Sequence, residues 1–211
     1  MRISALQLER ASGMTYESAA AWITAVNEAG EDCGLSSLLR WAMWIAQCGH
    51  ESGTFKKLAE SGDYSPERLL AVFPKYFTYE TAQAVGRTAA RPADQKAIFN
   101  RVYNGRMGNR PLSDDGWNYR GGGLIGVTGR EMYGKVGDHL GLDLLDEPDL
   151  IRTNRRYAAK STSYIWDSES VNRYADSRDI VGATERINGG HNGLDDRKTR
   201  YTLALSGLGL S

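Results

Sequence analysis

The stretch LLRWAMWIAQCGHE, residues 38–51, determines how the rest of the chain can fold. Serine at position 36 or 37 can cap its N-terminus. Apolar residues, two tryptophans among them, fall on nearly every side of a helix built from this stretch, which is typical of a buried central helix. Its last turn carries His50 and Glu51. The stretch therefore predicts a helical core that ends in two polar side chains.

The segments around this helix also have helical patterns. A capping box at Ser4 opens a short helix, a second helix runs from Thr15 to near Gly30, and another runs from Ser65 to a break at Pro74. The remaining predicted helices cover residues 78–85, 93–103, 130–140, 154–166, 180–188 and 195–205, and the glycine-rich segment 104–123 is predicted as loop. No alternating strand of real length is present, and at most a short hairpin is expected around residues 55–58. The pattern predicts an all-α fold.

Length and composition restrict the class of protein. The 211 residues fit one domain over 1–211, with the possibility of two lobes. Basic and acidic side chains number 26 each, which argues against nucleic acid as a partner. Two cysteines, Cys33 and Cys48, are too few for a disulfide scaffold and are expected as reduced, buried thiols. The N-terminus lacks the apolar region of a signal peptide, and the longest apolar stretch is too short to span a bilayer. We expect a soluble cytoplasmic chain without stable membrane insertion.

Two glutamates, Glu51 and Glu60, lie nine positions apart at the end of the central helix and in the segment that follows it. On a continuous helix, Glu51 and Glu60 would be separated by about 13.5 Å and would point to opposite faces. Gly53 can adopt the left-handed conformation that ends helices, so the chain can turn back and place Glu60 across a groove from Glu51. Hydrolysis of a glycosidic bond needs two such carboxyl groups. The alternative is a helix-end surface acid and an unrelated, solvated loop acid.

The surroundings of the two acids differ. Glu51 ends a buried, aromatic-lined helix, where burial and the helix C-terminus should favour its protonated form, as a general acid requires. Glu60 lies in a polar loop near Lys56 and Lys57, where it should stay ionised, as a general base requires.

Four blocks of the sequence resemble glycoside hydrolase family 19, the chitinase-like group that includes many phage endolysins. AQCGHESGTF at 46–55, NRVYNGRMGN at 100–109, WNYRGGGLIGVTGREMY at 117–133 and RINGGHNGLDDRKTRY at 186–201 are similar to family segments and occur in the family order. The resemblance implies a lysozyme-like helical domain of two lobes with a substrate groove between them.

The resemblance also implies roles for individual residues. Glu51 corresponds to the general acid and Glu60 to the general base, and Thr128 corresponds to the residue that holds the attacking water. Asn188 corresponds to an asparagine that contacts substrate. Arg197 matches the last block, and we expect it to pair with an acid of the site. Members of the family invert configuration and need no metal or other cofactor.

Three positions depart from the family pattern. Gly122 stands where arginine is frequent, Gly126 where a substrate-contacting glutamine is usual, and Met132 where asparagine is usual. The departures weaken the case for chitin as the substrate. The extra room near Gly126 could accept the lactyl ether and peptide of muramic acid.

Other residues admit more than one interpretation. Trp117 and Tyr119 could provide apolar faces for sugar rings or could pack beneath the loop. His50 is more consistent with a hydrogen bond that orients the turn of Glu51 than with a zinc site, because the H-E-x-x-H motif is absent. His139 and His191 would have to join it in a zinc amidase.

We therefore expect a phage endolysin that hydrolyses the β-1,4 backbone of peptidoglycan by a two-carboxylate, inverting mechanism. A chitinase, a non-catalytic wall-binding protein and a zinc amidase are the alternatives. The expected chain is a monomer with no separate wall-binding module. It would be made in the host cytoplasm and would act on the wall after a separate holin opens the membrane.

Overall fold

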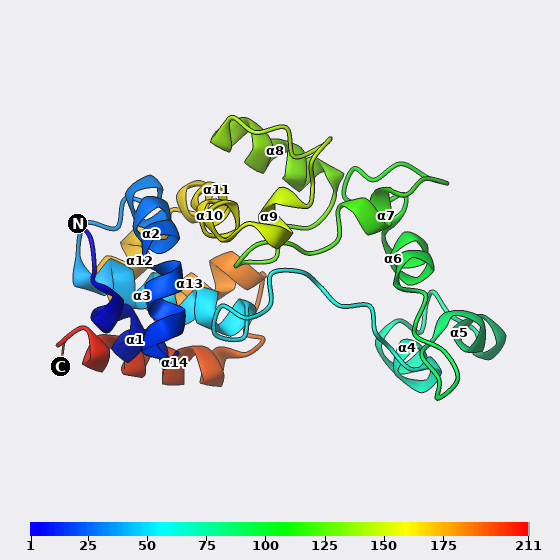
Figure 1. Cartoon of the computed structure of the whole chain (residues 1–211), viewed down its shortest axis with the longest axis horizontal. Helices are drawn as coiled ribbons and strands as arrows, with labels where there is room; N and C mark the ends of the chain where they lie inside the picture. The colour runs from blue at the N-terminus through cyan, green and yellow to red at the C-terminus, as the bar shows by residue number, and fades with distance from the viewer. Residues whose placement is uncertain (211) are drawn as a thin grey trace.

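The computed structural model describes residues 1–210, and the fold within them is helical and has two lobes (Figure 1). The helices are α1 (Ala5–Ser12), α2 (Tyr16–Asp32), α3 (Leu38–Glu51), α4 (Pro66–Val72), α5 (Tyr79–Val85), α6 (Gln95–Tyr103), α7 (Asp115–Asn118), α8 (Arg130–Leu140), α9 (Leu150–Thr153), α10 (Arg155–Lys160), α11 (Thr162–Ser168), α12 (Val171–Asp176), α13 (Ile180–Asn188) and α14 (Leu194–Gly207). No helix in this range has the length and apolar character needed to cross a membrane.

Helix α3 is the centre of the larger lobe, as its sequence predicts. The Ser37 hydroxyl caps its start by accepting a hydrogen bond from the Arg40 N–H. Trp41 and Trp44 are fully buried. Helices α1, α2 and α10 to α14 pack around α3 in one large apolar cluster. The end of α3 therefore points out of a rigid core toward the second lobe.

Two smaller apolar clusters complete the molecule. One lies around α8 and includes the buried Tyr133 and Val136. The other joins α4, α5 and α6 through residues such as Leu69 and Ile98. In Figure 1, α4 and α5 lie at the far end of the molecule from α1 and α14, and the chain of residues 52–65 crosses between the two parts.

Most predicted helices are confirmed, and the differences have local causes. The helix predicted over residues 154–166 is two helices, α10 and α11, because the chain turns at Ser161 and the buried Ser161 and Thr162 hydroxyls donate to carbonyls three residues earlier. The short helices α7, α9 and α12 were not predicted, and α7 lies in the segment expected to be loop. No strand is present in residues 1–210, and residues 55–58 contribute to a turn and an extended segment rather than a hairpin.

The two cysteines are free and buried, as expected. Burial raises the pKa of the Cys33 thiol to about 12 and raises that of Cys48 well above its ordinary value. Both thiols therefore stay protonated at neutral pH and act as small apolar side chains.

Candidate active site

The turn after α3 has three consecutive residues with positive φ. Gly53, Thr54 and Phe55 have φ angles of 58°, 61° and 62°. Glycine adopts this conformation freely, but each of the other two residues costs about 1–2 kcal/mol. The buried Ser52 supports the turn, because its hydroxyl donates to the Cys48 carbonyl and accepts from the Phe55 N–H. The turn expected at Gly53 is present and is tighter than one glycine could make it.

Contacts with the core hold this turn in place. The Phe55 ring is 4% exposed and packs against Trp22, with ring centroids 5.4 Å apart, and against Trp44, at 5.9 Å. Burial of a phenylalanine side chain stabilises by about 1.5–3 kcal/mol, which offsets much of the backbone strain. From α14, Arg200 donates to the Thr54 hydroxyl at 2.9 Å. The chain is thereby directed back across the molecule toward Glu60.

Both carboxylate oxygens of Glu60 accept hydrogen bonds. The Tyr103 hydroxyl, at the end of α6, donates to Oε1 at 2.9 Å, and the Gly121 N–H donates to Oε2 at 3.1 Å. The Glu60 N–H in turn donates to the Gly121 carbonyl at 2.8 Å. Burial, reinforced by the charge of Glu60, raises the pKa of Tyr103 well above its usual value, so Tyr103 remains a donor. Glu60 is therefore held by one hydrogen-bond donor at each of its two carboxyl oxygens.

The two carboxyl oxygens of Glu51 differ in their contacts. The Arg197 guanidinium, which is 1% exposed, donates to Glu51 Oε1 and also to the amide oxygen of the buried Gln47. The expected ion pair between Arg197 and an acid of the site is therefore present. Among the described residues, Glu51 Oε2 has no hydrogen-bond partner, and the Glu51 side chain is 24% exposed.

A single groove of about 1150 Å³ contains both acids. Thr128 and Asn188 line the same groove, so four of the residues implicated by the sequence lie together. A Cβ atom at Gly121 would lie 3.2 Å from Glu60 Oε2 and 3.4 Å from the Thr128 hydroxyl oxygen. These two oxygens therefore border one small space that glycine leaves open beside the base.

Two predicted sugar contacts are not on the groove. Tyr119 is 3% exposed, and its hydroxyl donates to the Leu145 carbonyl while its ring packs near Tyr133. Trp117 is partly buried, with the Arg120 guanidinium 3.6 Å from its ring centroid. Neither residue lines the groove of Glu51 and Glu60. Packing beneath the loop, the alternative interpretation, holds for Tyr119, because the amphipathic helix α8 needs apolar cover on its inner face.

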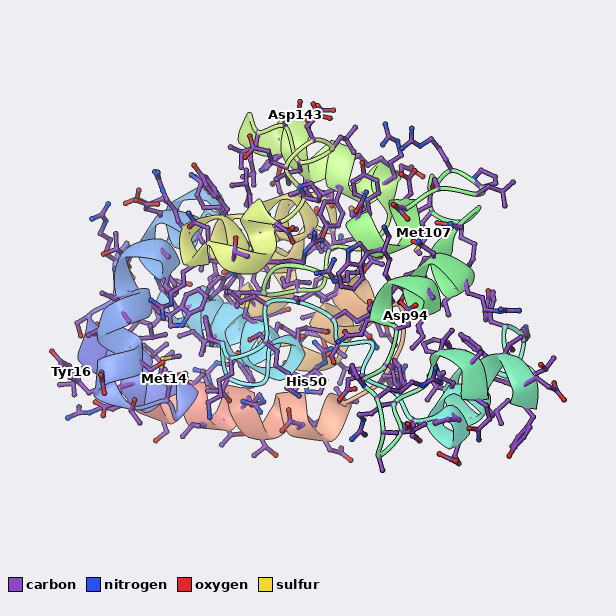
Figure 2. All side chains as sticks on the ribbon, turned by 45° about the vertical axis from the view of Figure 1, so that its right-hand side comes forward. Met14, Tyr16, His50, Asp94, Met107 and Asp143 are labelled. Carbon is purple, nitrogen blue, oxygen red and sulfur yellow. The ribbon has the colours of Figure 1, made fainter. Side chains whose placement is uncertain are left out.

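The histidines serve separate contacts. His50 lies in the last turn of α3, next to Glu51 (Figure 2), and its Nδ1 lies 2.6 Å from an Asp196 carboxylate oxygen, so a hydrogen bond links this turn to α14. His139 contacts Ser163, and His191 contacts Glu185. No cluster of three metal-ligating side chains occurs in residues 1–210.

The sequence did not reveal all residues of the groove. Tyr103 lies within the NRVYNGRMGN block, but nothing in its spacing showed that its hydroxyl reaches Glu60. Arg152 also lines the groove. A Cβ atom at Gly122 would lie 2.6 Å from the Tyr133 hydroxyl and 2.9 Å from Arg152 Cγ. The arginine that is frequent at position 122 therefore has no room here, because the Tyr133 hydroxyl and the Arg152 side chain occupy that space.

Known proteins resemble this chain in sequence and in fold. A Haemophilus influenzae protein described as containing a glycosyl hydrolase family 19 domain is 38% identical over 173 residues, which cover 81% of each chain. An inactive endochitinase of Arabidopsis thaliana is 31% identical over 117 residues, 50% of this chain and 42% of the relative. No family model matches the chain.

Among solved structures, chitinase C from Streptomyces griseus has a similar fold. Its TM-score is 0.63 at 18% identity, and the match covers 99% of this chain and 93% of the chitinase. The similarity in sequence to the Haemophilus protein extends over most of both chains, and the fold similarity extends over nearly all of this one. The chain therefore belongs to glycoside hydrolase family 19.

Proposed function

We propose that this protein hydrolyses the β-1,4 glycosidic backbone of bacterial peptidoglycan, as a phage endolysin of the muramidase type. The observation that carries the proposal is the pair of acids in one groove with contrasting contacts. Both oxygens of Glu60 accept hydrogen bonds, whereas Glu51 keeps one oxygen free of protein partners within the described residues. A base and an acid are thereby distinguished.

In the proposed reaction, Glu51 carries a proton on Oε2 and gives it to the glycosidic oxygen as the bond from that oxygen to C1 breaks. Glu60 takes a proton from a water molecule, whose oxygen forms a new bond to C1 from the opposite face of the ring. The configuration at C1 is inverted. Proton exchange with solvent then restores Glu51 and Glu60 to their starting forms.

Arg197 and Thr128 support this chemistry from either side. Arg197 favours the carboxylate that Glu51 becomes, so its contact strengthens as the proton leaves. The Thr128 hydroxyl donates to the Gly126 carbonyl at 2.9 Å, which leaves its oxygen lone pairs available to the attacking water beside Glu60. Loss of either contact should lower kcat more than it raises KM.

Two features of the groove favour peptidoglycan over chitin. A Cβ atom at Gly126 would have no heavy atom within 4 Å, so there is room for the lactyl ether of muramic acid. Lys56 and Lys57 line the groove with exposed side chains that are suited to carboxylates. Peptidoglycan carries carboxylates on its stem peptides, whereas chitin is uncharged.

We further propose a monomer made in the host cytoplasm that reaches the wall with the help of a holin.

Analysis of the products tests the proposal. Digestion of purified sacculi should release new reducing ends of muramic acid, and Glu51→Gln should lower the rate by about 10²–10⁴-fold without a change in circular dichroism. New glucosamine ends would indicate a glucosaminidase, and new free amines an amidase. Activity should persist in EDTA. Sacculi that remain undigested by a folded wild-type protein would refute the proposal.

A chitinase is the second candidate, because several relatives are named as endochitinases. Release of reducing ends from chitin oligosaccharides but not from sacculi would establish it. Some relatives are named inactive, which makes a binding protein without catalysis the third candidate. Binding to sacculi without any product would identify that case.

A further inference from the structure

A second hollow of about 1020 Å³ lies on the larger lobe, between α2 and the segment that contains α9 and the start of α10. Lys56 and Leu58 border this hollow and also border the groove of the two acids. The two spaces therefore meet along the short segment that leads from the turn after α3 to Glu60. A molecule bound in the groove can extend over this segment into the second hollow.

The second hollow has an aromatic floor and a basic rim. Trp22 and Phe55, each 4% exposed, form the apolar part of its lining. Arg155 and Arg156 stand exposed at the rim. Arg156 is paired with Glu28 at 2.5 Å. Arg155 has no ion pair within residues 1–210, and its guanidinium lies 5.8 Å from the Trp22 ring centroid.

Two basic side chains of this hollow remain available to a ligand. Glu28 neutralises one arginine, so Arg155 and the exposed Lys56 are the basic groups of this hollow that have no acidic partner among the described residues. Oxygen-rich and carboxylate groups are the natural partners of such cations, and amide planes or short apolar side chains suit the aromatic floor. The chemistry favours an anionic peptide over an uncharged sugar.

We propose that this hollow binds the stem peptide of the same peptidoglycan strand whose sugars occupy the groove. The inference rests on the proposed function. A stem peptide of four or five residues extends about 13–18 Å, which is enough to pass over the Lys56–Leu58 segment from a muramic acid in the groove. Its carboxylates then meet Arg155, and its backbone lies against the floor of Trp22 and Phe55.

The test compares two substrates that differ only in their peptides. One is purified sacculi, and the other is glycan strands from the same sacculi after an amidase has removed the stem peptides. Arg155→Glu is a suitable perturbation, because position 155 is the first residue of α10 and an acid there is compatible with the helix. Arg155→Lys keeps the charge. Lys198→Glu, on the exposed side of α14, is the matched control for a general loss of positive charge.

Binding of the stem peptide in this hollow predicts a specific pattern of kinetic results. Wild type should have a lower KM for intact sacculi than for peptide-free strands. Arg155→Glu should raise KM for intact sacculi by about fivefold and leave peptide-free strands unaffected. Arg155→Lys should retain most of the wild-type preference, and Lys198→Glu should behave as wild type on both substrates.

Other patterns overturn the inference, and they separate it from the proposed function. If Arg155→Glu raises KM equally on both substrates, the hollow binds sugar. If it changes neither, the hollow takes no part in substrate binding. In both cases wild type still digests peptidoglycan, so the proposed function stands. If wild type digests neither substrate but cleaves chitin, the proposed function fails and this inference fails with it.

Discussion

Replacement of Arg197 by methionine should reveal how strongly α14 is coupled to the acid of the site. Methionine fills much of the same volume but removes the guanidinium that contacts Glu51 and Gln47. The Gln47 oxygen would be left fully buried without a donor, at a cost of about 1–3 kcal/mol. Glu51 is 24% exposed, so loss of its cation should cost well below the 3–5 kcal/mol of a fully buried pair. We expect a total of about 3 kcal/mol.

Urea unfolding of a double-mutant cycle measures the part that belongs to the ion pair. The cycle combines Arg197→Met with Glu51→Gln, which keeps the shape of the acid and removes its charge. Arg197→Met should cost about 1–2 kcal/mol less in the Glu51→Gln background. Lys198→Met is the matched control on the same helix: its side chain is exposed, so its cost should stay within about 0.5 kcal/mol.

The reasoning fails if the two backgrounds give the same cost for Arg197→Met within about 0.5 kcal/mol. Arg197 would then stabilise the fold by packing and by its bond to Gln47 alone. In that case the rate of glycan cleavage should also be insensitive to the substitution once folding is restored at low temperature. Our expectation is a loss of about 10²-fold in kcat, because the transition state develops charge on Glu51.

Further substitutions test the base and the space beside it. Glu60→Gln should lower the rate of sacculus digestion by about 10²–10⁴-fold with unchanged circular dichroism, and a near-normal rate would remove Glu60 from the mechanism. Gly121→Ala should lower kcat, because the added Cβ would lie in the space between Glu60 and Thr128, and normal kinetics would show that water does not use this space. Gly126→Gln should reduce cell-wall lysis, with Gly126→Ala as the control for the strain of a φ of +77° there; equal lysis by both variants would contradict the role given to the extra room. Burial holds the pKa of Cys33 at about 12, above the ordinary thiol value of 9.0, so the thiol loses its proton first in the unfolded state and the free energy of unfolding should fall as pH rises above about 9. A Cys33→Ala variant should show a weaker decline in urea titrations, and an equal decline would assign it to other groups.

The helices could be predicted from the sequence because their signals are local. Caps at Ser37 and Ser65 and the spacing of apolar residues placed α3 and α4 within a residue or two. The break at Ser161 could not be predicted in the same way. Ser161 is fully buried and lies against Gly123, from a distant part of the chain, and only the fold shows this contact.

The residues of the candidate site also divide into those with a local sequence signal and those whose contacts only the fold makes. Glu51, Thr128 and Asn188 were picked out because they occur in ordered blocks that resemble a family, and Glu60 because it lies in the loop after the first block. The structure places all four on one groove. The misplacement of Tyr119 has a physical reason: an aromatic side chain suits a core and a sugar equally well, and sequence does not reveal which one it meets. The contact from Tyr103 to Glu60 spans 43 positions, so no local pattern could reveal it.

The tight turn at Gly53, Thr54 and Phe55 has a consequence for how this protein loses its activity on heating. Its unfavourable backbone is retained only while Phe55 stays seated between Trp22 and Trp44 in the centre of the larger lobe. The loop that carries the base therefore cannot loosen ahead of the interior. On heating, enzymatic activity and the near-ultraviolet signal of the tryptophans should therefore be lost in one transition at the same temperature. The packing of Trp22, Trp44 and Phe55 then sets how long activity lasts at a given temperature.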